Sequence, residues 1–130
     1  MKNKFFYLIC FALSFFIFQS LHSNEIFNFN LTEIEITQDG NLFKGRNGGE
    51  AFTNDGISIK AKNFEYNKSR FLLKAADEVE YEDKKRNIII KADKISYFKS
   101  EEKIFAEGNV NILDKNKNLE IKEEEISYFK

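Results

Sequence analysis

A repeat of 31 residues is the feature that most constrains how this chain can fold. Two sets of residues recur at that spacing, namely Ile59, Ile90 and Ile121, and Tyr66, Tyr97 and Tyr128. A looser copy around Ile34 and Ile36 comes 30 residues before the first one. Self-similarity at a fixed period predicts a repeat architecture in which neighbouring copies bury each other's apolar faces.

Within each copy, apolar and polar residues alternate with a period of two. Ile57, Ile59 and Ala61 alternate with Ser58 and Lys60. This is the pattern of a strand with one buried face and one solvated face. The second and third copies, which begin at Ile88 and Leu119, repeat it.

The alternation shifts by one residue at the same place in successive copies. After Ala61 the next apolar residues are Phe64 and Tyr66, and after Ala92 the next one is Ile95. An extra residue at an equivalent place in each copy predicts a β-bulge, or a corner at which the strand bends.

A second apolar set lies between the copies. It comprises Leu73, Ala75, Val79 and Tyr81, and 31 residues later Ile104, Ala106, Val110 and Ile112. Turn signals rich in Asp, Asn and Gly separate the apolar runs, at residues 39–40, 45–49, 54–56, 83–87, 108–109 and 114–118. Such residues tolerate the positive φ of tight hairpin turns. We therefore predict nine to eleven short strands, no helix after residue 23, and an all-β layered fold, an open β-jelly-roll or solenoid-like form.

Residues 1–23 have the three parts of a secretory signal. Lys2 and Lys4 precede an uncharged, Phe-rich run from Phe5 to Leu21, and Ser23 offers a small residue for cleavage. The run would reach roughly 26 Å as a signal helix, slightly less than a ~30 Å hydrocarbon core. We predict a cleaved signal peptide at 1–23 and one domain at 24–130, with an uncleaved membrane anchor as the alternative.

Loss of the signal would remove groups that many kinds of site require. Cys10 and His22 are the only cysteine and the only histidine, so thiol, disulfide and imidazole chemistry would be excluded. Without Lys2 and Lys4, the 20 Lys and Arg become 18 against 21 Asp and Glu. That balance argues against nucleic acid as a partner. We predict no enzyme activity, no catalytic residue, no metal and no cofactor.

A few charged or turn segments allow weaker site hypotheses. Residues 39–41 and 54–56 could offer oxygen ligands to calcium, although hairpin turns explain them. The acidic pair Glu101–Glu102 and the run Glu123–Glu125 are read as solvated faces rather than acid/base pairs. The basic group Lys84–Arg86 is read as a charged turn, with lipid phosphate as the alternative partner.

From residue 27 to residue 130 the chain resembles the OstA-like periplasmic domains of lipopolysaccharide transport. The segments that carry the resemblance are 27–41, 54–66 and 92–110, which includes Ala92-Asp-Lys-Ile95-Ser-Tyr97 and Ala106-Glu-Gly108-Asn109-Val110. Each motif is short, but their repeated order is specific. The closest form is the N-terminal periplasmic segment of the outer-membrane lipopolysaccharide-assembly protein. A free-standing bridge component comes second and a membrane-anchored form third.

The resemblance implies a periplasmic β-jelly-roll, open along one side, that stacks end to end with others of its kind and conducts lipopolysaccharide to an outer-membrane barrel assembly. The inward alternates would then contact lipid, and the alternative is that they fill a closed core. These candidates are Ile57, Ile59, Ala61, Phe64, Ile88, Ile90, Ala92, Ile95, Ile104, Val110 and Ile112.

The terminal strands are the expected docking sites for other jelly-rolls. We place them at Ile26–Ile36 and Leu119–Phe129, because an edge strand can accept a strand from another chain. The alternative is that their charged residues prevent such pairing. Glu123 replaces the alanine of the earlier copies, which favours a polar cap over an exposed docking edge.

The chain ends in mid-repeat, directly after Phe129. We therefore expect either a truncated form of the outer-membrane assembly protein, associated with the outer membrane, or a short free-standing bridge. The competing hypothesis for function is a β-solenoid surface or structural protein that transports no lipid.

Overall fold

The computed structural model describes residues 26–130, and the predicted signal segment 1–23 lies outside them. The described part is built from β-strands joined by tight turns, with one turn of 3₁₀ helix. The elements are β1 Asn28–Thr37, β2 Leu42–Phe52, β3 Ile57–Ala61, β4 Asn63–Asn67, β5 Leu72–Asp83, β6 Ile88–Phe98, η1 Lys99–Glu101, β7 Lys103–Asp114 and β8 Leu119–Phe129. The predicted all-β class is confirmed.

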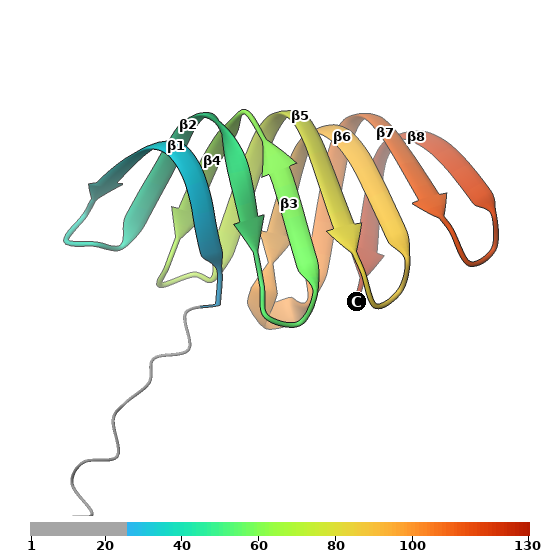
Figure 1. Ribbon diagram of the computed structural model, residues 1–130, viewed down its shortest axis with the longest axis horizontal. Helices are drawn as coiled ribbons and strands as arrows, with labels where there is room; N and C mark the ends of the chain where they lie inside the picture. Colours follow the sequence, from blue (N-terminus) through green and yellow to red (C-terminus); the bar gives the residue numbers. More distant parts are fainter. Residues whose placement is uncertain (1–25) are drawn as a thin grey trace, which may run out of the picture.

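All eight strands belong to one antiparallel sheet in which neighbours in sequence are neighbours in space. The order is β1-β2-β3-β5-β6-β7-β8, and β4 continues the line of β3 between β2 and β5. β1 and β8 form the two edges, at opposite ends of the long axis (Figure 1). Each 31-residue repeat therefore corresponds to two antiparallel strands, so the sheet grows by one hairpin per repeat.

The predicted nine to eleven short strands are fewer and longer in the structure. Six of the eight contain 10 to 12 residues, because the chain keeps its sheet pairing on both sides of the bend. β3 and β4 are short because Lys62 interrupts them. The Lys62 N–H donates to the Asp77 carbonyl at 3.1 Å, and its own carbonyl accepts from the Gly48 N–H at 2.9 Å.

The predicted bend is present, but the extra residue sits in the strand beside the predicted one. The register of β5 and β6 shifts between Ala76 and Val79, where Asp77 and Glu78 stand opposite Asp93. Asp77 and Glu78 have left-handed φ values of 67° and 53°. β7 has an equivalent bulge at residues 108–109, where the φ values are 79° and 49°. A bulge of this kind sharply increases the local bend of a strand.

Because each long strand bends at the bulge, the sheet folds over a ridge into two walls that face each other (Figure 1). Wall A contains β3, the first parts of β1, β6 and β8, and the last parts of β2, β5 and β7. Wall B contains β4 and the remaining parts of the same strands. The turns lie along the two rims opposite the ridge, and we call the seam between these rims the mouth.

Rows of inward side chains run along the molecule from one edge strand to the other. The central row of wall A is Phe29, Ala51, Ile59, Tyr81, Ile90, Ile112 and Ile121. The matching row of wall B is Ile36, Phe43, Tyr66, Leu73, Tyr97, Ile104 and Tyr128. The two rows meet, since the rings of Tyr81 and Tyr97 pack edge to face with centroids 6.3 Å apart. The core therefore lies between the walls.

Small residues line the crease directly under the ridge. They are Gly45, Gly49, Ala61, Ala75, Ala92 and Ala106. A Cβ added to Gly45 would come within 2.7 Å of the Leu31 side chain. The small residues alternate with large residues along the same rows, since Phe64 and Ile95 stand opposite Ala75. Each small residue therefore makes room for the large side chains beside it, which explains the alanine that recurs in the repeat.

Candidate binding interior and edge strands

All eleven predicted lining residues belong to the inner face of the folded sheet. Nine are buried and two, Ile88 and Ile112, are partly buried against the same cluster. Their side chains fill the space between the walls along the middle of the sheet. The structure thus places these residues on the inner face, and contact of these residues with lipid stays a prediction.

The structure adds inner-face residues that were not among the predicted lining set. They include Phe27, Tyr66, Leu73, Tyr81 and Tyr97. The tyrosines at 66 and 97 were visible in the period of 31, and Leu73 and Tyr81 in the second apolar set. No local sequence signal shows that the apolar residues of the repeat and those of the second apolar set face each other across the interior.

Phe27 closes the mouth near the β1 end. Its side chain is only 2% exposed, and its ring packs edge to face on Tyr66 and Tyr97, with centroid distances of 5.2 and 5.6 Å. Because Phe27 precedes β1 on wall A and both tyrosines belong to wall B, this contact joins the two walls. The contact by which Phe27 joins the walls at this end is therefore aromatic.

Charged residues close the mouth near the β8 end, and we call Asp55, Lys99, Glu102 and Lys130 the clasp. Asp55 lies in the β2–β3 turn on the rim of wall A, and the other three lie on the rim of wall B. Lys99 Nζ is 3.5 Å from Asp55 Oδ2 and 2.7 Å from Glu102 Oε1. Lys130 Nζ donates to Asp55 Oδ2, and the Tyr97 hydroxyl donates to Glu102 Oε2 at 2.8 Å.

The clasp lysines stabilise the ionised forms of its two acids. Partial burial of Asp55 by itself raises its pKa, but hydrogen bonds from Lys130 and Thr53 and the charge of Lys99 bring the pKa well below its ordinary value. The pKa of Glu102 is lowered in the same way, because hydrogen bonds from Lys99 and Tyr97 outweigh the effect of burial. The clasp is therefore a pH-sensitive link between the walls.

Tyr81 and Asp83 lie side by side on β5, inside the mouth and next to the clasp, and both are completely buried. Asp83 Oδ1 accepts the backbone N–H groups of Lys85 and Arg86, each at 3.0 Å. Within residues 26–130, neither the other oxygen of Asp83 nor the Tyr81 hydroxyl has a hydrogen-bond partner. Burial, together with the charge of Asp83, raises the pKa of Tyr81, so its hydroxyl stays protonated.

The interior opens at both ends of the long axis. On β1, the inward side chains Ile34 and Ile36 are 52% and 54% exposed. On β8, Leu119 and Ile121 are 46% and 40% exposed. Each of these strands pairs on one side only within the described residues. The predicted terminal strands are thus the sheet edges, while docking at them stays a prediction.

Glu123 takes the crease position of β8, opposite Val110. It is exposed, as are Glu124 and Glu125. The carboxylate run therefore marks the β8 edge of the crease, and this position is compatible with both a polar cap and a docking edge.

The weaker site hypotheses resolve into turns and surface contacts. Residues 39–41 and 54–56 form the β1–β2 and β2–β3 turns, and Asp55 is occupied by the clasp lysines. Lys84–Arg86 form the β5–β6 turn, from which Arg86 Nη1 donates to the Tyr128 hydroxyl at 3.1 Å. In the described part of the chain, no group of three or more acidic, His or Cys side chains could hold a metal ion.

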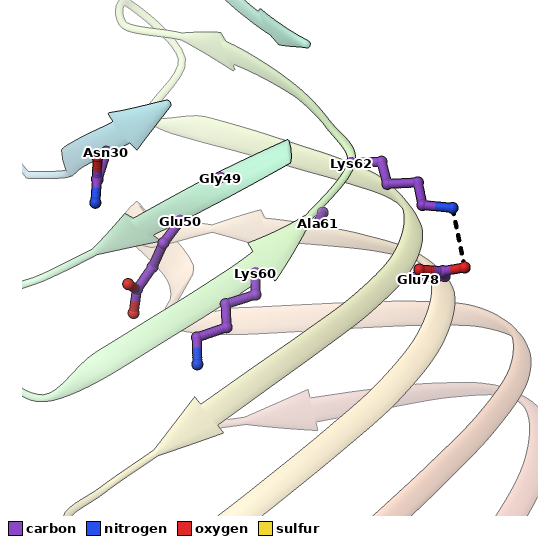
Figure 2. A pocket seen from close by; sticks show the side chains of 7 residues that line it. All are labelled: Asn30, Gly49, Glu50, Lys60, Ala61, Lys62 and Glu78. Atoms are coloured by element: carbon purple, nitrogen blue, oxygen red, sulfur yellow. Dashed lines mark hydrogen bonds and ion pairs between the residues drawn. The ribbon is translucent and has the colours of Figure 1, made fainter. Parts of the chain in front are cut away.

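A surface hollow beside the bend has a different character from the interior. Figure 2 shows Lys62 paired with Glu78 on the outside of the fold, with Glu50 and Lys60 nearby. The Lys62–Glu78 pair is well exposed, with a distance of 2.9 Å. Exposed pairs of this type contribute little, and the hollow gathers no set of converging buried groups.

The fold is similar to that of a solved bacterial protein. The similar structure is LptH from Pseudomonas aeruginosa, described as the LptA-homologous periplasmic component of the conserved lipopolysaccharide transport device, with a TM-score of 0.68 and 12% sequence identity. The match covers 78% of this chain and 74% of LptH. At this identity the likeness shows the fold alone. No protein-family model and no curated protein sequence matches the chain.

Among the described residues there is no helix long and apolar enough to cross a bilayer.

Proposed function

We propose that this chain binds lipopolysaccharide in the periplasm and passes it along a bridge of similar domains. The observation that carries the proposal is a single sheet folded around a continuous apolar interior that is open at both ends. The similarity of this fold to that of LptH supports it, as do the OstA-like motifs in the sequence.

The physical task requires a continuous apolar path. Burial of a CH₂ group is worth about 0.8 kcal/mol, so an acyl chain of roughly a dozen carbons represents on the order of 10 kcal/mol. The inward rows run from β1 to β8 and supply apolar surface along the whole long axis. Half-exposed isoleucines at both ends would let chains pass to and from a neighbouring domain.

Lipid enters, in this proposal, through separation of the two walls at the mouth. In the middle of the sheet the inward side chains of the two walls are buried against one another, so acyl chains must replace contacts between the walls. The ridge is continuous backbone with sheet pairing on both sides, whereas within residues 26–130 the mouth is closed by side chains. Parting the walls breaks the clasp and the Phe27 contacts but leaves the sheet intact.

Edge strands would carry the bridge. β1 and β8 each offer backbone N–H and C=O groups on the side that is unpaired within the described residues, and such an edge can accept a strand from a second jelly-roll. Stacking of this kind would join the open ends and continue the apolar rows into the next domain.

The finer assignment rests on the sequence resemblance. We propose that residues 1–23 direct export, and that the domain works beside the outer membrane as the periplasmic segment of a barrel assembly, with a free-standing bridge component as the alternative. We propose no enzymatic role.

Photo-crosslinking in living cells tests the lipid path. A photo-reactive residue at Ile59 or Ile90, both buried and inward, should capture lipopolysaccharide. The matched controls are their neighbours Lys60 and Lys91, which are exposed on the outer face. Capture at the lysines alone, with none at the isoleucines, would overturn the proposal.

A further inference from the structure

Among the described residues, Tyr81 and Asp83 are a fully buried polar pair at the mouth that the fold does not explain. The two residues lie on the same face of β5, in the central and rim rows of wall A. One oxygen of Asp83 holds the β5–β6 turn through two backbone N–H groups. Asp114 does the same for the β7–β8 turn, through Asn116 and Lys117. Formation of the turn therefore explains why Asp83 Oδ1 is buried. It does not explain the burial of Asp83 Oδ2 or of the Tyr81 hydroxyl.

Two polar atoms remain to be explained, Asp83 Oδ2 and the Tyr81 hydroxyl. Neither has a hydrogen-bond partner in residues 26–130, and both residues are 0% exposed. A buried polar group without a partner lowers the stability of a fold. Phenylalanine at position 81 would fill the same space without that cost, so packing alone does not favour a tyrosine here.

A side-chain contact between the walls lies near the pair. Arg86, on the rim of wall A, donates through Nη1 to the hydroxyl of Tyr128 on wall B, at 3.1 Å. Arg86 and Tyr128 are near enough to Tyr81 to act on its charge state. This contact spans the mouth, as the clasp does, so separating the walls exposes Tyr81 and Asp83 together.

The chemistry of the pair selects one kind of ligand group. Asp83 Oδ2 accepts a hydrogen bond, and the protonated Tyr81 hydroxyl donates one. A hydroxyl group fits both, since it donates to the carboxyl oxygen and accepts from the phenol. A phosphate oxygen without a proton could not donate a hydrogen bond to the Asp83 carboxyl group. A quaternary or fully substituted amine has no N–H group and could not donate one either.

We propose that Tyr81 and Asp83 form a subsite for a hydroxyl group of a sugar headgroup, while the attached acyl chains lie on the adjoining apolar rows. The inference rests on the proposed lipid-binding function and specifies where the headgroup is recognised. The rows next to the pair contain Ile59 and Ile90 on wall A, so a sugar held at the mouth places its chains directly on the predicted lining residues.

Two detergents that share a dodecyl chain separate headgroup recognition from chain binding. Binding of dodecyl maltoside and of dodecyl dimethylamine oxide is measured below their micelle concentrations, by calorimetry. The wild-type domain should bind the maltoside more tightly. Tyr81→Phe should weaken maltoside binding by about three- to tenfold, the value of one hydrogen bond, and leave amine-oxide binding unchanged. Asp83→Asn, which retains the oxygen that holds the turn, should also reduce the maltoside preference.

The thermal stability of the lipid-free protein is the second readout. Tyr81→Phe should raise its Tm, because the substitution removes a buried hydroxyl without a partner. Tyr97→Phe is the matched control on the next strand. Its hydroxyl is bonded to Glu102, so this change should lower the Tm and affect the two detergents alike.

Three results would overturn the subsite. Equal affinity of the wild-type protein for both detergents would reject it and leave lipid binding standing. A lower Tm for Tyr81→Phe with an unchanged maltoside preference would mean that an internal water satisfies the hydroxyl. Failure of both detergents to bind would reject the proposed function, and the subsite with it.

Discussion

Alanine recurs at the crease of this fold, opposite large side chains. Ala75, Ala92 and Ala106 recur in successive strands where the two walls converge, and Ala106 is 0% exposed. Isoleucine and tyrosine fill the interior, and the alanines leave room for the large side chains opposite them, such as Ile95 opposite Ala75 and Ala106.

Enlarging a crease residue should destabilise the fold. Ala106→Leu should cost about 1–3 kcal/mol, because the added carbons have no space between the walls. The free energy of unfolding in denaturant measures this. Glu107→Leu is the control, since Glu107 is the exposed neighbour whose only described ion pair, with Lys94, spans 3.9 Å at the surface. If Ala106→Leu were as stable as the wild type, the claim that the crease has no space for a larger side chain at position 106 would be wrong.

The clasp makes stability depend on pH in acid. The pKa of Asp55 is depressed below its ordinary 3.8 in the fold, so its contribution is fully present above that value and is lost as pH falls towards the folded pKa. Wild-type protein should lose more stability than Asp55→Asn when pH drops from about 5 to about 2. The comparison uses Tm across this range. Parallel curves for the two proteins would show that Asp55 does not stabilise the closed mouth.

At the scale of the elements, the edge strands combine exposure with inward orientation. Ile34 and Ile36 face the same way as the core residues of the neighbouring strands, yet about half of each side chain is exposed. An apolar inner face that is left uncovered at the end of a sheet suits contact with another domain.

Charges on the inner face of β1 should block stacking without unfolding the domain. Replacing both Ile34 and Ile36 with lysine should change stability by no more than about 1 kcal/mol, because both positions are exposed. Concentration-dependent association of the domain, measured by sedimentation, should fall. Glu35→Lys, on the outer face of the same strand, is the matched control. Undiminished association of the double variant would exclude this end as a docking site.

The strands and the bend could be predicted from the sequence because both leave local signals. Alternation identifies the strands, and the shift after Ala61 and Ala92 identifies the bend. The bulge was predicted in the wrong strand, because Asp77 and Glu78 have the sequence of ordinary surface residues. Their left-handed φ values appear only where β5 pairs with β6. The clasp was also missed. Asp55 and Lys130 are 75 residues apart, and only the closed fold brings them together.

For the whole molecule, the central question is whether the two walls can part. The ridge joins them through backbone, while the mouth joins them through the clasp, the Phe27 contacts and the Arg86–Tyr128 bond. In the proposed function, this asymmetry lets the two walls separate on the side of the mouth. The interior would then be a packed core without lipid and a lipid path when the walls separate.

The most direct test places a spin label on the acyl chains of lipopolysaccharide and follows the isoleucine methyl signals of the domain by NMR. The methyl signals of Ile59 and Ile90 should broaden strongly, because the chains lie between the walls. Ile89 is the internal reference, since it neighbours Ile90 but faces the outside of wall A, and its signal should persist. Broadening of Ile89 while Ile59 and Ile90 stay sharp would contradict the account, because lipid would then contact only the outer surface of a closed core.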